Sequence, residues 1–189
     1  MNSEPLNLDN LFLIGYRCTG KTTVGKCLAE DLGWSFVDTD LLIVKQQKMS
    51  IKEIVGAHGW EKFRQMEHAM LKTVCASQRQ VVATGGGIVL NEHNVTAMRQ
   101  SGGVIWLRAK HETIKNRMLR DKDTMDFRPA LTANDSLFEI EETLQSREPL
   151  YRKATDLFVD TDDHNITEVA NIMIEKLKSV YPRLFEARE

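Results

Sequence analysis

The chain has 189 residues, of which 42% are hydrophobic, so it can bury one substantial core, and we expect a single domain over residues 1–189. Its 25 Lys and Arg residues are balanced by 27 Asp and Glu, which argues against nucleic acid as a partner. No apolar run approaches the roughly 20 residues that cross a bilayer, so we expect no membrane contacts. The three cysteines show no CxxC spacing, and we expect a cytoplasmic protein. We also expect a monomer.

The first expected elements are a strand and a helix joined by a phosphate-binding motif. The apolar run 11–14 predicts a buried strand, and apolar residues at helical spacing predict a helix over 21–32. Between them, GYRCTGKT fits the pattern GxxxxGK[ST], in the strand-then-helix context that this motif requires. Backbone N–H groups of such a loop, together with the positive end of the helix dipole, bind phosphate oxygens.

Each residue of this loop is a candidate nucleotide contact. The set is Gly15, Tyr16, Arg17, Cys18, Thr19, Gly20, Lys21, Thr22 and Thr23. Within it, Lys21 is expected to reach the β- and γ-phosphates, and the Thr22 hydroxyl is expected to ligate Mg²⁺. The alternative is a glycine-rich turn that binds no ligand.

Two carboxylates follow the second expected strand, which covers residues 34–37. Ligands of a parallel sheet collect beyond the carboxyl ends of its strands, and we expect Asp38 and Asp40 there, one strand away from the phosphate loop. The two side chains point the same way if the chain is extended, or split if the next helix begins between them. One can hold a metal through its waters and the other can accept a hydroxyl proton. The alternative is that Asp38 or Thr39 only caps the following helix, which carries the apolar run 41–44.

A short helix and a long helix are expected next. Ser50 followed by Glu53 predicts a capped helix that ends near Gly56 or Gly59. The following apolar stripe predicts a helix over residues 59–78.

Arg64 lies on the long helix, and Glu67 lies one turn later. The two side chains can pair, and such a pair is ordinarily a solvated surface bridge. The third strand, 81–83, ends in Gly85-Gly86-Gly87. Three glycines bring bare backbone N–H groups to the strand-end surface and admit a small ligand closely, although a plain flexible turn is the alternative.

The remaining chain continues the alternation of helices and strands. We expect helices over 91–101, 114–119, 135–153 and 166–177, and strands over 104–107 and 157–159. The polar segment 121–135 is expected to be mobile, as are the flanks 1–10 and 182–189 around a core of about 11–178. Five buried strands alternating with helices predict an α/β protein, with a parallel sheet covered on both faces.

Six motifs, taken together, resemble one known family. They are GYRCTGKTTVG (15–25), FVDTD (36–40), FRQME (63–67), VVATGGG (81–87), FRPAL (127–131) and REPLY (147–151). In this order, over nearly the whole chain, they resemble the shikimate kinases. The resemblance implies a three-layer α/β/α P-loop kinase fold with a five-stranded parallel sheet, a mobile lid over 121–135 and substrate-binding helices. It also implies ATP-dependent phosphorylation of the 3-hydroxyl of shikimate, with Mg²⁺, in aromatic amino-acid biosynthesis.

The resemblance implies a role for each matching residue. Asp40 is similar to the family's aspartate that binds substrate hydroxyls and is proposed to act as base, and Asp38 is similar to the one near Mg²⁺. Arg64 and Arg147 resemble the pair that grips the substrate carboxylate, with Gly85, Gly86 and Gly87 lining the same pocket. Arg128 resembles the lid arginine that closes on the transferring phosphate beside Lys21. By a gapped match, Arg117 resembles the arginine that lies over the adenine.

Cys18 is one departure from the family pattern, because it replaces a glycine that is common in the loop. We expect either a negative φ at this residue or a tolerated strain. Two other functions stay open. One is a kinase for another small polyol acid such as gluconate, and the other is a related binding module without catalysis.

Overall fold

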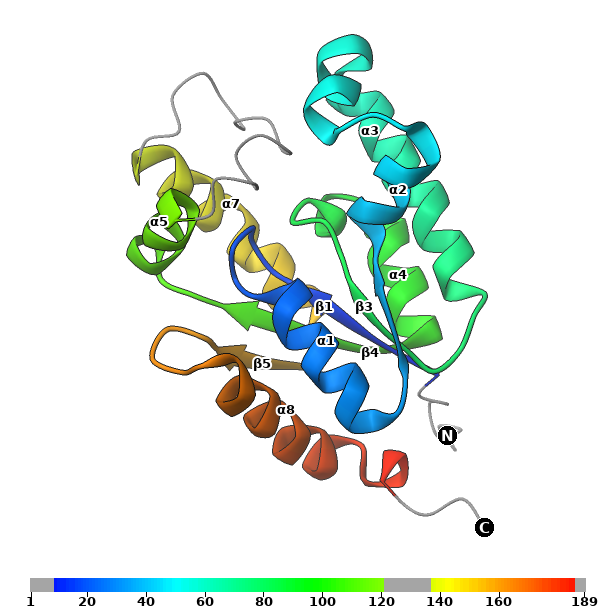
Figure 1. Ribbon diagram of the computed structural model, residues 1–189, viewed down its shortest axis with the longest axis vertical. Helices are drawn as coiled ribbons and strands as arrows, with labels where there is room; N and C mark the ends of the chain where they lie inside the picture. The colour runs from blue at the N-terminus through cyan, green and yellow to red at the C-terminus, as the bar shows by residue number, and fades with distance from the viewer. Residues whose placement is uncertain (1–8, 121–136, 186–189) are drawn as a thin grey trace.

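The structure, a computed structural model, describes residues 9–120 and 137–185. Within these residues, five parallel strands form one sheet in the spatial order β2-β3-β1-β4-β5. The strands are β1 (Asn10–Ile14), β2 (Ser35–Asp38), β3 (Gln80–Ala83), β4 (Gly102–Arg108) and β5 (Leu157–Asp160). Helices pack on both faces of this sheet (Figure 1), so the expected three-layer α/β/α arrangement is confirmed.

The helices of the described residues follow the expected order. They are α1 (Lys21–Leu32), α2 (Thr39–Gln47), α3 (Ile51–Cys75), α4 (Glu92–Ser101), α5 (His111–Arg120), α7 (Leu137–Ala154) and α8 (Ile166–Val180), with short 3-10 turns η1 (Ile88–Leu90) and η2 (Pro182–Leu184). None of them is both long enough and apolar enough to span a membrane. The expected lid, residues 121–135, lies outside the described residues, as does the expected start of the helix over 135–153.

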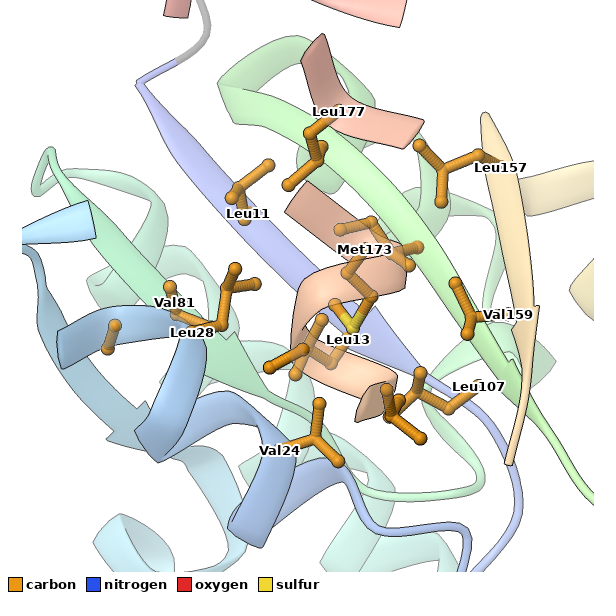
Figure 2. Packing of buried hydrophobic residues seen from close by; sticks show 14 residues of the cluster. Leu11, Leu13, Val24, Leu28, Val81, Leu107, Leu157, Val159, Met173 and Leu177 are labelled. Atoms are coloured by element: carbon orange, nitrogen blue, oxygen red, sulfur yellow. The ribbon is translucent and has the colours of Figure 1, made fainter. Parts of the chain in front are cut away.

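The two faces of the sheet follow from the alternation of side chains along β1. Leu11 and Leu13 point to one face, where they pack with α1 and α8, as Figure 2 shows. Phe12 and Ile14 point to the other face, where they pack with α3, α4 and α7. All four side chains are fully buried, and burial of each one stabilises the fold by roughly 1.5–3 kcal/mol.

The two expected helices before β3 form one bent element, α3. Ser50 and Glu53 make the predicted capping box at its start. The bend is at Gly59, whose φ of 79° and ψ of 167° are not helical, so of the two predicted ends, Gly56 and Gly59, the second is observed. The second half ends at Cys75, three residues earlier than residue 78, where the prediction placed its end.

The position of β2 corrects one expectation. Asp38 and Asp40 were expected one strand away from the phosphate loop, but β3 lies between β2 and β1. After β1 and α1 the chain forms β2 at the edge of the sheet. The strand β3, which comes later in the sequence, lies between β1 and β2. The carboxyl end of β2 therefore lies beside the glycine turn that follows β3.

Candidate active site

The phosphate loop connects β1 to α1, and glycine occupies the points where its backbone requires it. Gly15 has φ 139°, and a Cβ there would lie 2.4 Å from the Leu107 carbonyl oxygen. Gly20 has φ 94° and precedes the first turn of α1. Lys21 Nζ donates to the carbonyl oxygens of Gly15 and Tyr16 at 2.8 and 2.7 Å. The Lys21 ammonium group is thereby held against the loop.

Cys18 has a strained backbone within this loop. Its φ is 60°, in the left-handed region that favours glycine, so of the two expected outcomes the strained one is observed. For a residue with a Cβ, this conformation costs about 1–2 kcal/mol. The Cys18 carbonyl oxygen accepts a hydrogen bond from Arg117 Nη1 at 3.3 Å, which ties the strained residue to α5.

Arg117 also joins α5 to the segment after β5. Its Nη1 donates to Thr161 Oγ1 at 2.9 Å, and its Nη2 donates to the Thr161 carbonyl oxygen. Arg117 lines an open cavity of about 590 Å³ that is also bounded by Gly20, His164 and Ile166. This cavity adjoins the phosphate loop at the first turn of α1. A nucleoside that extends from phosphates bound in the loop has space there, and Arg117 is on its wall.

Thr22 and Asp38 meet where α1 begins and β2 ends. Thr22 Oγ1 donates to Asp38 Oδ2 at 2.8 Å. Asp38 Oδ1 accepts from the N–H groups of Asp40 and Leu41 at 3.1 and 3.2 Å, so Asp38 is also the N-cap of α2. Helix α2 begins at Thr39, between the two aspartates, so of the two predicted arrangements the split one is observed.

The Thr22–Asp38 pair has the chemistry of a Mg²⁺ site that depends on a nucleotide. Mg²⁺ prefers oxygen ligands and is usually bound through one or two protein groups, waters and substrate phosphates. Across residues 9–120 and 137–185, no group of three or more His, Cys, Asp or Glu side chains is arranged to hold a metal. A hydroxyl and a carboxylate beside the phosphate loop therefore fit an ion that phosphates help to hold.

Asp40 and Glu67 place two buried carboxylates beside the glycine turn 85–87. Asp40 is 4% exposed and Glu67 is 1% exposed. A Cβ on Gly85 would lie 2.8 Å from Asp40 Oδ1 and 2.3 Å from Glu67 Oε1, so a larger residue there would displace both carboxylates. Because β2 and β3 are neighbours, the start of α2 brings Asp40 to this position.

Arg64 packs on the same turn from α3. Its Nη1 pairs with Glu67 Oε2, and because Glu67 is buried, the expectation of a solvated surface bridge is wrong. The Arg64 guanidinium lies so close to Gly87 that a Cβ there would be 2.3 Å from its Cζ. It also lies 5.1 Å from the ring centroid of Trp60 and 5.6 Å from that of Phe63. Because α3 crosses the carboxyl ends of the strands, the helix face that carries Arg64 and Glu67 is turned inward.

Arg147 reaches the turn from the opposite side, on α7. Its Nη1 donates to the Gly86 carbonyl oxygen at 3.2 Å, and its guanidinium lies 6.0 Å from the centroid of the Tyr16 ring. All these groups line one pocket. Its walls are Tyr16, Arg17, Asp40, Ile51, Trp60, Phe63, Arg64, Glu67, Gly85, Gly86, Gly87 and Arg147. The pocket therefore combines guanidinium groups, two carboxylates and an apolar wall.

A model of one protein family covers most of the chain. The model described as shikimate kinase matches residues 17–178. The chain belongs to the shikimate kinase family. A shikimate kinase from Caldanaerobacter subterraneus subsp. tengcongensis is 42% identical over 167 residues, which are 88% of this chain and 95% of that protein. A shikimate kinase 2 from Yersinia enterocolitica is 44% identical over 150 residues, which are 79% of this chain and 85% of that protein.

Solved structures agree with membership of the shikimate kinase family. The shikimate kinase from Acinetobacter baumannii in complex with shikimate has a TM-score of 0.86 and 31% identity, and the match covers 93% of this chain and 96% of that one. A gluconokinase from Sinorhizobium meliloti has a TM-score of 0.56 and 18% identity, with 94% and 95% covered, so it shares the fold alone. The P-loop kinase fold that the sequence motifs implied is confirmed.

Several residues of this shikimate kinase pocket were not among the predicted substrate contacts. They are Tyr16, Arg17, Ile51, Trp60, Phe63 and Glu67. Trp60 and Phe63 belong to the apolar stripe that predicts the long helix, and in the structure this stripe faces the pocket as well as the core. Arg17 and Tyr16 were predicted as nucleotide contacts, whereas both line the pocket with Arg64 and Arg147. The predicted lid residue Arg128 lies outside the described residues.

Burial of Glu67 predicts a pH-dependent stability. Burial raises the pKa of Glu67 to about 7 from its ordinary value of 4.5, and the charge of Asp40 adds to this effect, while Arg64 and Arg147 oppose it. Between pH 4.5 and about 7, Glu67 binds a proton in the folded protein and releases it in the unfolded chain. The free energy of unfolding should therefore fall as pH rises from about 4.5 to 7, by up to about 3 kcal/mol from this group.

Chemical denaturation of the wild type and of Glu67→Gln across this pH range isolates the effect, because all other groups are common to both proteins. We expect the difference in unfolding free energy between them to change with pH in the window between 4.5 and 7. Glu61→Gln, at an exposed position on the same helix, should give a curve parallel to the wild type. Parallel curves for Glu67→Gln as well would contradict the prediction.

Proposed function

We propose that this member of the shikimate kinase family transfers the γ-phosphoryl group of ATP to the 3-hydroxyl of shikimate. The products are shikimate 3-phosphate and ADP, in the biosynthesis of chorismate and the aromatic amino acids. The observation that carries the proposal is the convergence of Arg64 and Arg147 on one glycine turn, in the same pocket as the buried carboxylate of Asp40. The similar Acinetobacter baumannii enzyme was solved in complex with shikimate.

The pocket matches the chemistry of a small ring acid. Shikimate has one carboxylate and three hydroxyls. Guanidinium groups donate paired hydrogen bonds to a carboxylate, and Arg64 and Arg147 supply two of them from opposite sides of the turn. Ile51, Trp60 and Phe63 give the apolar surface that suits the carbon ring. The Asp40 carboxylate can then accept a hydrogen bond, and finally a proton, from the hydroxyl that receives the phosphoryl group.

The phosphate side of the site is formed by the loop and α1. Phosphoryl transfer requires mainly alignment of donor and acceptor and neutralisation of charge on the γ-phosphate. Lys21 supplies a positive charge at the loop, and Thr22 and Asp38 are the residues that would hold Mg²⁺. When bound with ATP, Mg²⁺ neutralises phosphate charge. We assign Arg128, by its place in the FRPAL motif, to the lid that closes on the transferring phosphate.

The same proposal includes a cytoplasmic monomer that acts on small molecules, without nucleic acid or membrane as a partner. The balanced charge of the chain supports the absence of a nucleic-acid partner. Purified protein should therefore elute from a calibrated size-exclusion column at the volume of a single chain of 21.6 kDa.

Arg147→Ala tests the carboxylate grip. We expect the KM for shikimate to rise roughly 30-fold or more, because a charge-assisted hydrogen-bond pair is lost, while the KM for ATP stays within about twofold. An assay coupled to ADP release measures both constants. Arg147 is preferred to Arg64 for this test, since loss of Arg64 would leave Glu67 buried without its cation.

Arg152→Ala is the matched control, because Arg152 lies on the same helix and pairs with Glu148 at the surface. It should leave both KM values unchanged. Equal increases of the two KM values in Arg147→Ala would argue against the carboxylate grip. Turnover of gluconate but not of shikimate by the wild type would refute the proposed function itself.

A further inference from the structure

The Gly86 carbonyl oxygen is held from α7 by two donors. The Tyr151 hydroxyl donates to it at 2.5 Å, and Arg147 Nη1 donates at 3.2 Å. Tyr151 is fully buried, and its ring stacks on Trp106 with 5.6 Å between centroids. Its hydroxyl is thus fixed by the packing of its ring. Burial also raises the pKa of Tyr151 to about 12, so the hydroxyl keeps its proton.

The peptide unit between Gly86 and Gly87 contacts two of the three arginines that line the pocket, Arg64 and Arg147. Arg147 hydrogen-bonds to its carbonyl oxygen, and the Arg64 guanidinium packs directly against Gly87. No cis peptide occurs in the described chain, so the carbonyl and the following N–H point in opposite directions. Displacement of the turn at this unit would therefore move the acceptor of Arg147 and the surface on which Arg64 packs together. Glycine itself does little to prevent such a displacement, because it has no Cβ.

A second buried side chain holds the other end of the turn. Asn94, 2% exposed on α4, donates through Nδ2 to the Ile88 carbonyl oxygen at 3.3 Å. A carbonyl oxygen can only accept, so Asn94 Oδ1 faces His68 Nδ1, 2.6 Å away, and this nitrogen carries the proton. His68 directly follows Glu67 on α3. The bridge therefore joins the helix of Arg64 to the glycine turn.

We infer that Tyr151 and Asn94 are positioning residues for substrate binding, which hold the glycine turn so that Arg64 and Arg147 meet the substrate carboxylate at a fixed separation. Tyr151 acts on the Gly86–Gly87 peptide from α7, and Asn94 acts on Ile88 from α4. Both act through the turn, and neither is among the described residues that line the pocket. The inference rests on the proposed function, because it names the carboxylate of that substrate.

Tyr151→Phe removes one hydroxyl and keeps the ring. We expect the KM for shikimate to rise about tenfold, since the hydrogen bond that holds the turn beside Arg64 and Arg147 is lost, and the KM for ATP to stay within about twofold. KM does not depend on the fraction of folded enzyme, so a loss of stability alone cannot produce this split. Tyr181→Phe is the matched control. Tyr181 bonds to Asp156 and packs on Gly103, at the start of β4 and far from the turn.

Asn94→Leu tests the second residue that holds the turn. If Tyr151→Phe does not fold, the KM for shikimate and the KM for ATP of Asn94→Leu decide the question. A rise in the KM for shikimate that spares ATP, absent in Tyr181→Phe, supports the inference. Unchanged constants in folded variants, or equal rises for both substrates, overturn it. If the wild type does not phosphorylate shikimate, the proposed function fails, whereas wild-type turnover with an unaffected Tyr151→Phe refutes only the positioning role.

Discussion

Lys21→Met is expected to lower kcat by about 10³-fold, because it removes the cation that the phosphate loop provides for the γ-phosphate. Methionine has nearly the length of lysine, so the buried stem of the side chain is preserved while the charge is lost. Lys21 is 6% exposed, and its Nζ is held by the carbonyl oxygens of Gly15 and Tyr16. These two hydrogen bonds hold the ammonium group at the loop where phosphates would bind. Steady-state assays at saturating ATP and shikimate measure the loss.

Lys26→Met is the control for this variant. Lys26 is exposed on the same helix, and its only described aromatic contact is with Phe36 at 5.9 Å. We expect its kcat to equal that of the wild type. A decrease in kcat of less than about tenfold for Lys21→Met, with ATP binding intact, would show that Lys21 does not stabilise the transferring group.

Asp40→Asn is expected to lower kcat by roughly 10²-fold or more, because the amide keeps the shape of the side chain but cannot accept a proton. Asp40 is 4% exposed, at the start of α2, and its Oδ1 lies beside Gly85 and Glu67. This position is within the proposed substrate pocket. Kinetics at saturating substrate separate the proton-accepting role from binding, since binding alone would change KM.

Asp31→Asn, at an exposed position on α1, should leave kcat and both KM values unchanged. If Asp40→Asn raises the KM for shikimate and leaves kcat within about threefold, Asp40 binds a substrate hydroxyl and does not act as base. Phosphoryl transfer through a loose transition state would be compatible with that result, because little proton removal is then needed early in the step.

Features that depend on neighbouring residues could be predicted from the sequence. The phosphate loop is one, because glycines at fixed spacing between a strand and a helix determine its backbone shape. The capping box of Ser50 and Glu53 and the break at Gly59 are others, since caps and glycine conformations are set within one helical turn. The alternation of buried strands with helices likewise predicted the parallel sheet and its two covered faces.

Features that depend on packing between distant segments were decided by the tertiary structure. Strand order is the main case: β3 lies between β1 and β2, and this brings Asp40 beside Gly85. Glu67 looked like half of a surface ion pair, but the position of α3 over the strand ends buries it. The φ of 60° at Cys18 could not be deduced from the motif. Glycine is common at this position of the loop, and the motif does not say whether a cysteine there keeps a positive φ or adopts a negative one.

By itself, then, the sequence determined the phosphate loop and the class of fold, and it indicated the charged residues that we propose for the site. Local hydrogen bonds and steric limits act over a few residues, so the pattern they produce can be recognised in the amino-acid sequence. The tertiary structure decided which of those residues meet, that Tyr151 and Asn94 reach the glycine turn, and which charges are buried. Tyr151 and Gly86, for example, are 65 positions apart in the chain, and no local pattern encodes their contact.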